Sequence, residues 1–146
     1  MHVLVVYDSS PDGHSALRYA EAAADSAGAP LTVLAVAPVE RVDVGCLRCR
    51  QGAAIWNHEL EEIAAEELRE AAMKVGPSGS VRYDVARGPQ TKAIADVATR
   101  SGADLIVLPW RRPRWFRGAS ARNLAERLRR EGAWQVAVAP PASDGA

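Results

Sequence analysis

Arginines and aromatic residues are concentrated in one loop near the end of the chain, directly after an apolar run. The apolar run, residues 104–108, has the composition of a buried strand. The basic loop begins at Pro109, and a helix is expected to begin near Ser120. A strand, a loop and a helix N-terminus form the layout with which many α/β proteins hold a phosphate group.

Three interpretations of this arginine loop are open. In the first, arginine side chains hold an anion in bidentate contacts, helped by the dipole of the following helix. The arginines available for this are Arg111, Arg112, Arg114, Arg117 and Arg122. In the second, the arginines and the interleaved Trp110, Trp115 and Phe116 form a surface on which nucleic-acid bases stack. In the third, the loop is a solvated basic face whose aromatic side chains pack on the domain or on a partner. The formal net charge of zero counts against the second, so no nucleic-acid partner is expected.

A second group of polar residues follows the first apolar run of the chain. Asp8, Ser9 and Ser10 come directly after Val3–Tyr7. Asp8 is a candidate to bind a ligand hydroxyl or a metal, and its alternative role is to cap the helix that Ser10 and Pro11 begin. No base can be assigned to either serine, and His14 is expected to be a surface residue. We therefore predict no catalytic residue and no enzymatic activity.

The two cysteines, Cys46 and Cys49, form a single CxxC motif. A structural zinc site needs more ligands than this pair supplies, and His58 or Asp43 is a candidate for one more. A redox role favours a motif at the start of a helix, whereas the helix is expected only from Ile55. The favoured interpretation is a pair of loop cysteines in a reducing compartment, with no bound metal.

The order of apolar runs and helical patterns along the chain is βαβαβαβαβ, which predicts a parallel, doubly wound α/β sheet with helices on both faces. The strands are expected over Val3–Tyr7, Leu31–Ala37, Val81–Ala86, Asp104–Leu108 and Trp134–Ala139. The helices are expected from Ser10 to Gly28, from Ile55 to Val75, from Gly88 to Gly102 and from near Ser120 to Gly132.

The composition of the strands predicts their order in the sheet. The first and fourth strands are apolar throughout and should be central, while the third and fifth alternate and should lie at the edges. Right-handed crossovers then give a five-stranded sheet of order 3-2-1-4-5. Ligands of such sheets bind where the strand order reverses, here between the first and fourth strands. Asp8 and Pro109 follow these two strands.

Length and composition indicate one domain over residues 1–140 and a short tail over 141–146. No apolar stretch approaches the roughly 18 residues of a membrane span. The N-terminus lacks the pattern of a secretory signal, so a cytoplasmic protein without a membrane partner is expected. Six glutamates lie between Glu59 and Glu70, and they are expected to form a solvated helix face.

The chain resembles the universal stress protein family over nearly its whole length. The segments that carry the resemblance are Val5–Pro11, Ala16–Ala20, Gly28–Leu34, Gly88-Pro89, Gly102–Val107 and Leu124–Leu128. The resemblance implies the Rossmann-like fold derived above and a role in the stress response. It also implies a homodimer joined through the last strand.

Nucleotide-binding members of the family carry the motif G-x2-G-x9-G-[ST] after the fourth strand. Its spacing falls without a gap on Pro109, Arg112, Arg122 and Asn123, so all three glycines are missing. Glycine lets the backbone approach phosphate oxygens, whereas proline has no N–H and a fixed φ. The resemblance thus implies a vestigial or anion-binding site made of Asp8, Ser9, Ser10, Val39, Gly88, Pro109, Arg112, Arg122 and Asn123.

These observations favour a non-enzymatic stress-response regulator with an unidentified protein partner and no cofactor, which does not bind ATP in the family manner. The alternative is a sensor of ATP, AMP or another phosphate anion that uses arginines of residues 109–123 in place of the glycines. An enzymatic role, such as weak nucleotide hydrolysis, would require turnover that is lost in Asp8→Ala.

Overall fold

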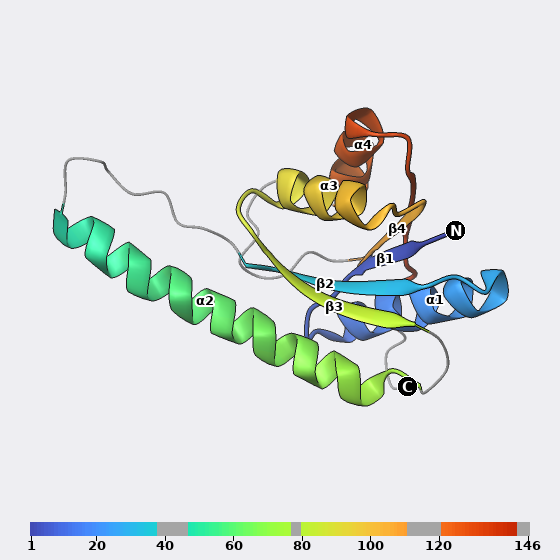
Figure 1. The fold of residues 1–146 in the computed structure, drawn as a ribbon, viewed down its shortest axis with the longest axis horizontal. Helices are drawn as coiled ribbons and strands as arrows, with labels where there is room; N and C mark the ends of the chain where they lie inside the picture. The colour runs from blue at the N-terminus through green and yellow to red at the C-terminus, as the bar shows by residue number, and fades with distance from the viewer. Residues whose placement is uncertain (38–46, 77–79, 111–120, 143–146) are drawn as a thin grey trace.

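The computed structural model describes residues 1–37, 47–76, 80–110 and 121–142. Five parallel strands form one sheet of order β3-β2-β1-β4-β5, which confirms the predicted order (Figure 1). The strands are β1 Val3–Val6, β2 Leu31–Ala37, β3 Val81–Arg87, β4 Leu105–Leu108 and β5 Gln135–Val138. The helices are α1 Pro11–Ala27, α2 Leu47–Lys74, α3 Gln90–Ser101 and α4 Ala121–Glu131.

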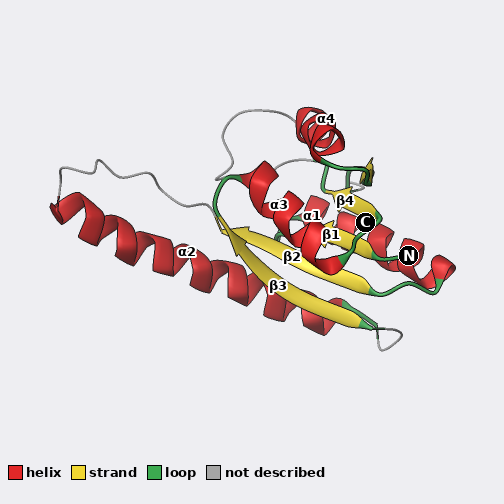
Figure 2. Ribbon diagram, turned by 45° about the horizontal axis from the view of Figure 1, so that its top comes forward, coloured by secondary structure: helices red, strands yellow, loops and turns green. Residues whose placement is uncertain are grey.

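Helices cover both faces of the sheet (Figure 2). On β1, Val3 and Val5 pack against α1 and α2, as does Tyr7, the residue that follows the strand. Leu4 and Val6 pack in the other cluster, which includes α3 and α4. Every residue of β1 and β4 is buried, because these central strands are covered on both sides. Because β1 and β4 pair in parallel at the centre of the sheet, their carboxyl ends lie side by side.

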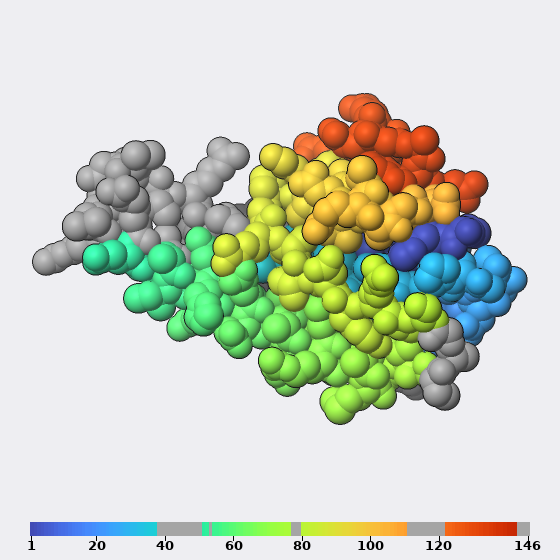
Figure 3. All heavy atoms as spheres, in the orientation of Figure 1, coloured from blue at the N-terminus to red at the C-terminus, as the bar shows by residue number. Residues whose placement is uncertain are grey.

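The second helix begins earlier than the sequence pattern predicts. It starts at Leu47 rather than at Ile55, because leucine, arginine, glutamine and alanine are good helix formers and the single Gly52 does not end it. Over its 28 residues α2 is much longer than the four to seven residues of the strands. Its N-terminal half therefore extends beyond the sheet, and in the space-filling view its atoms form one edge of the molecule (Figures 1 and 3).

This geometry corrects the predicted apolar stripe of α2. Trp56 and Ile63, which were expected to face the core, are 47% and 44% exposed. Trp56 lies on the part of α2 that extends beyond the sheet, whereas Ile63 lies at the side of the buried stripe. Among the described side chains of α2, the buried ones are Leu60, Ala64, Glu67, Leu68 and Ala71. The presence of a glutamate in this set bears directly on the site described below. No helix in the described part of the chain is both long enough and apolar enough to cross a membrane.

Candidate functional site

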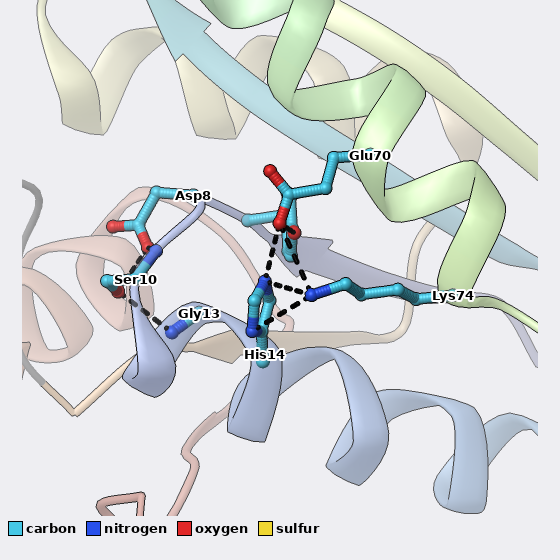
Figure 4. Close-up of polar contacts among 7 residues, drawn as sticks. Asp8, Ser10, Gly13, His14, Glu70 and Lys74 are labelled. Atoms are coloured by element: carbon cyan, nitrogen blue, oxygen red, sulfur yellow. Dashed lines mark hydrogen bonds and ion pairs between the residues drawn. The ribbon is translucent and has the colours of Figure 1, made fainter.

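Asp8 lies at the carboxyl end of β1, where the strand order reverses, and only 4% of its surface is exposed. Its Oδ1 atom accepts a hydrogen bond from the Ser10 N–H at 2.9 Å and a second from the Ser10 hydroxyl (Figure 4). Its Oδ2 atom is buried and has no hydrogen-bond partner among the described residues. One carboxylate oxygen of Asp8 therefore supports helix α1, while the other is an unpaired acceptor.

The first turn of α1 is packed tightly against this carboxylate. Ser10 is the N-cap residue, and its hydroxyl oxygen accepts from the Gly13 N–H at 3.0 Å. A Cβ atom on Gly13 would lie 2.2 Å from the Asp8 carbonyl oxygen and 2.4 Å from Oδ1. The predicted capping role is thus divided between two residues: Ser10 caps the helix, and Asp8 holds Ser10.

A second buried carboxyl group belongs to α2. Glu67 is 7% exposed, and this burial raises its pKa to about 7, with further contributions from the charges of Asp8 and Glu70. The prediction that the glutamates form a solvated face is therefore wrong at this position. The signal was present in the spacing, because Glu67 lies seven residues after Leu60 and three after Ala64, on the buried stripe.

Beside the two carboxyls, α1 and α2 are joined by a partly buried polar network. Glu70 Oε1 lies 3.0 Å from His14 Nε2 and 3.3 Å from Lys74 Nζ, and it accepts from the Tyr7 hydroxyl at 3.4 Å (Figure 4). The Tyr7 and His14 rings stack with centroids 5.6 Å apart. Burial raises the pKa of the Tyr7 hydroxyl, and the charge and hydrogen bond of Glu70 raise it further.

Glu70 is the acceptor on which this network converges. Partial burial acts to raise the pKa of its carboxyl group, but hydrogen bonds from His14, Lys74 and Ser9 outweigh burial and lower it. His14, expected at the surface, is 26% exposed and tied to α2. Sequence reasoning missed this contact because its partners are 56 and 60 residues away in the chain.

Two other predicted site residues follow β4 and β3. Pro109 comes directly after β4 and is buried, and β4 pairs with β1, so Pro109 lies beside the strand that leads to Asp8. Gly88 follows β3 with φ 111°, and its N–H donates to the Ala37 carbonyl at 3.2 Å. A residue with a side chain is strained at this φ, so the position requires glycine for backbone reasons alone.

The remaining predicted residues lie on α4 or outside the described residues. Arg122 and Asn123 are in the first turn of α4, and both side chains are exposed. Val39 and Arg112 lie outside the described residues, as does the rest of the arginine loop over 111–120. An anion site made by these arginines therefore stays a prediction.

Residues 1–140 match the model of the universal stress protein family. The chain belongs to the universal stress protein family. No curated protein matches the chain. Among solved structures, it is similar to a universal stress protein family member from Burkholderia pseudomallei, with 23% identity, a TM-score of 0.67 and 94% of each chain covered. It is also similar to the universal stress protein UspA from Lactobacillus plantarum, with 18% identity, a TM-score of 0.69 and coverage of 96% and 97%.

One similar structure is a universal stress protein in complex with cAMP, with 15% identity, a TM-score of 0.56 and 98% of each chain covered. At these identities the similarity establishes the fold. Within that fold, this universal stress protein has a buried proline, Pro109, directly after β4 and an exposed arginine, Arg122, in the first turn of α4.

The cysteine motif of this universal stress protein is only partly described. Cys46 and the side chain of Cys49 lie outside the described residues. Because α2 begins at Leu47, the expectation that the helix starts well after the motif is wrong, and Cys49 belongs to its first turn. Within the described part of the chain, no group of three or more histidine, cysteine, aspartate or glutamate residues could hold a metal ion.

Proposed function

We propose that this universal stress protein is a non-enzymatic stress-response regulator that does not hold the triphosphate of ATP through a glycine-rich loop. The observation that carries this proposal is Pro109, which follows β4 directly and is buried, and β4 pairs with the strand that leads to Asp8. A phosphate loop binds oxygens through backbone N–H groups, and proline has none. The exposed Arg122 adds a side chain where close backbone approach would be needed.

The polar groups near Asp8 also support a non-enzymatic role. The Ser10 hydroxyl is engaged by Asp8 on one side and by the Gly13 N–H on the other. The His14 imidazole, a side chain that could act as a general base, is engaged by Glu70 and Lys74. The contacts of the Ser10 hydroxyl with Asp8 and with the Gly13 N–H belong to the N-terminal cap of α1, and they support a structural role for this serine.

A second function, sensing of a nucleoside or nucleoside monophosphate, is favoured by one specific observation. Asp8 Oδ2 is a buried acceptor without a partner among the described residues. Leaving such an atom unpaired costs about 1–3 kcal/mol, and a hydroxyl group of a ligand sugar would relieve that cost. Similar structures hold cAMP and dAMP. This sensor would bind its ligand through Asp8 and would not need contacts to a triphosphate group.

A ligand screen by thermal denaturation separates these functions. If the protein does not hold a triphosphate, we expect ATP and pyrophosphate to leave Tm unchanged at millimolar concentration. If it is a nucleoside sensor, adenosine or AMP should raise Tm progressively, by an amount that corresponds to about 2.7 kcal/mol at a hundredfold excess over Kd. The matched control is Asp8→Asn, which should abolish the response. A rise with ATP and pyrophosphate but not with adenosine would contradict both proposals.

We further expect a homodimer joined through β5. This strand is an edge of the sheet, and the Gln135 and Ala139 N–H groups donate to the carbonyls of Asp104 and Leu108. The alternating N–H groups of Val136 and Val138 therefore point to the free edge. Light scattering should give twice the chain mass of 15.6 kDa. Val138→Pro removes an edge donor while sparing the pairing with β4, and it should yield a monomer. A monomeric wild type at micromolar concentration would refute the dimer.

A further inference from the structure

The strand β3 is the edge of the sheet opposite to β5, and no strand of the described structure pairs with its outer side (Figure 2). Natural proteins commonly protect such an edge with a proline, a bulge or a very short strand. None of these three occurs in β3, which pairs with β2 without interruption over all seven residues of Val81–Arg87. The edge can therefore accept a further strand.

The pairing with β2 determines which backbone groups of β3 are directed outward. The Gly88 N–H, directly after the strand, donates to the Ala37 carbonyl of β2 at 3.2 Å. Successive residues of a strand direct their backbone groups to opposite sides, so the even-numbered residues of β3 bond to β2. The N–H and C=O groups of Val81, Tyr83 and Val85 therefore point away from the sheet.

The side chains at this edge form a symmetric sequence. Val81 and Val85 pack against the cluster beneath α1 and α2, and Tyr83, 39% exposed, lies on the same face by its spacing. Arg82 and Asp84 lie on the opposite face, where they line an open groove between β3 and α3. The order is apolar, cationic, aromatic, anionic and apolar, so the strand is complementary to its own reversed sequence.

We propose that the β3 edge is an interface with a second copy of this chain, in which the two β3 strands pair antiparallel about a two-fold axis at Tyr83. In this register the two Tyr83 residues lie opposite each other and exchange both of their outward backbone hydrogen bonds. Each Arg82 lies opposite the Asp84 of the second copy, and each Val81 lies opposite Val85. The two sheets become one continuous sheet.

The charges of β3 select this register among the neighbouring symmetric ones. A two-fold axis at Arg82 places two arginines opposite each other, and an axis at Asp84 places two aspartates opposite each other. Like charges directly opposite are destabilising. An axis at Val85 brings no opposite charges together, because Asp84 then lies opposite Ala86. Of these registers, only the one at Tyr83 joins charges of opposite sign, and it does so twice.

The side of α2 next to β3 suits the approach of a second copy. Glu61 forms an ion pair with Arg87 of β3, whereas Glu70 is directed to α1, so the two sides of α2 are identified. The small side chains of Ala65 and Ala72 follow Glu61 on the β3 side at helical spacing. Because α2 packs on β2 and β3, a strand spacing of about 4.8 Å places the two α2 helices about 10 Å apart, a normal helix packing distance.

This contact goes beyond the dimer proposed at β5. Since β3 and β5 are opposite edges, pairing at β3 would join β5 dimers end to end into an extended assembly. Charge pairs at an exposed edge each contribute little to association. Pairing at β3 is therefore expected toward millimolar protein, whereas the β5 dimer is expected already at micromolar concentration.

Sedimentation equilibrium of the full-length Val138→Pro chain tests the contact without the β5 interface. The mass should rise from that of one chain at micromolar concentration toward twice 15.6 kDa near millimolar concentration. Asp84→Arg places like charges opposite each other at both symmetric positions and should weaken association at least about tenfold. Adding Arg82→Asp exchanges the two charges and should restore association. Only residues that lie opposite each other across the interface give this recovery.

Asp96→Arg is the matched control, because Asp96 is exposed on α3 and its replacement changes the net charge by the same amount. This variant should associate like its parent. Tm at micromolar concentration verifies that each variant folds, and if Val138→Pro does not, the series is repeated in the wild-type chain, where the β3 contact adds mass beyond the β5 dimer.

A mass that does not rise toward millimolar concentration, or a double exchange as weak as Asp84→Arg alone, would overturn the inference. A wild type that is monomeric at micromolar concentration but shows the charge-sensitive association at higher concentration would refute only the β5 dimer.

Discussion

Replacement of Gly13 by alanine is expected to destabilise the protein by about 3 kcal/mol, the upper range for overpacking of a tight site. The added Cβ would lie 2.2 Å from the Asp8 carbonyl oxygen and 2.4 Å from Oδ1, distances that real Cβ contacts do not reach. Because the nearest atom belongs to the backbone, a side-chain rotation cannot relieve the clash. The first turn of α1 would have to move away from β1, which would weaken the Ser10 cap.

The control for this experiment is a second helical glycine without neighbours. A Cβ on Gly52 in α2 would meet nothing within 4 Å, so Gly52→Ala should stabilise the protein by up to about 1 kcal/mol through helix propensity. Urea denaturation of both variants measures the difference directly. Equal effects of the two substitutions, or a neutral Gly13→Ala, would show that α1 is not packed against Asp8 as described.

The centre of the fold could be predicted because both faces of the central strands are buried. Residues 3–6 and 105–108 are apolar without alternation, and only strands covered on both sides require this. The alternating pattern of 81–86 in turn predicted an edge. The strand order could then be predicted from the right-handedness of the connections. Asp8 could be predicted as a site residue because it lies where that order reverses. These inferences use only local pattern and general topology.

The limits of α2 could not be predicted in the same way. Helical periodicity placed Trp56 and Leu60 on one stripe, but a stripe is buried only where a sheet lies beneath it. The strands are too short to cover the whole helix, so Leu60 is buried and Trp56 is exposed. The same reasoning explains Glu67, whose position on the stripe was visible but whose charge suggested solvent. In both cases the position of the sheet, and not the pattern of the helix, determined burial.

The side-chain contacts within the candidate site could also not be predicted from the sequence. Asp8 and Ser10 are neighbours, and their capping role could be inferred from residue type. Glu70 and Lys74 reach Tyr7 and His14 only because α2 packs over β2 and β3, and no local signal specifies that packing. The network at His14 is therefore a finding of the tertiary structure. The arginines of residues 111–120 lie outside the described residues, and their role stays a prediction.

The stability of the ligand-free protein should depend on pH through Glu67 in an unusual direction. Its pKa rises from 4.5 in the unfolded chain to about 7 in the folded protein, so the folded state holds a proton that the unfolded state has lost. The stabilisation by this proton is fully present below about pH 4.5 and is lost as pH rises through about 7. A shift of this size corresponds to about 3 kcal/mol in total. Buried carboxylates in ion pairs show the opposite trend.

Comparison with Glu67→Gln isolates this contribution, because groups such as His2, whose pKa is lowered mainly by burial, are common to both proteins. Between about pH 5 and pH 8, the free energy of unfolding of the wild type should fall relative to that of Glu67→Gln by up to about 3 kcal/mol. Glu59→Gln should track the wild type. A difference that stays constant with pH would mean that Glu67 ionises at its ordinary pKa and that its side chain is not buried as described. A falling difference would show that the charged form of Glu67 opposes the burial of this side chain on α2.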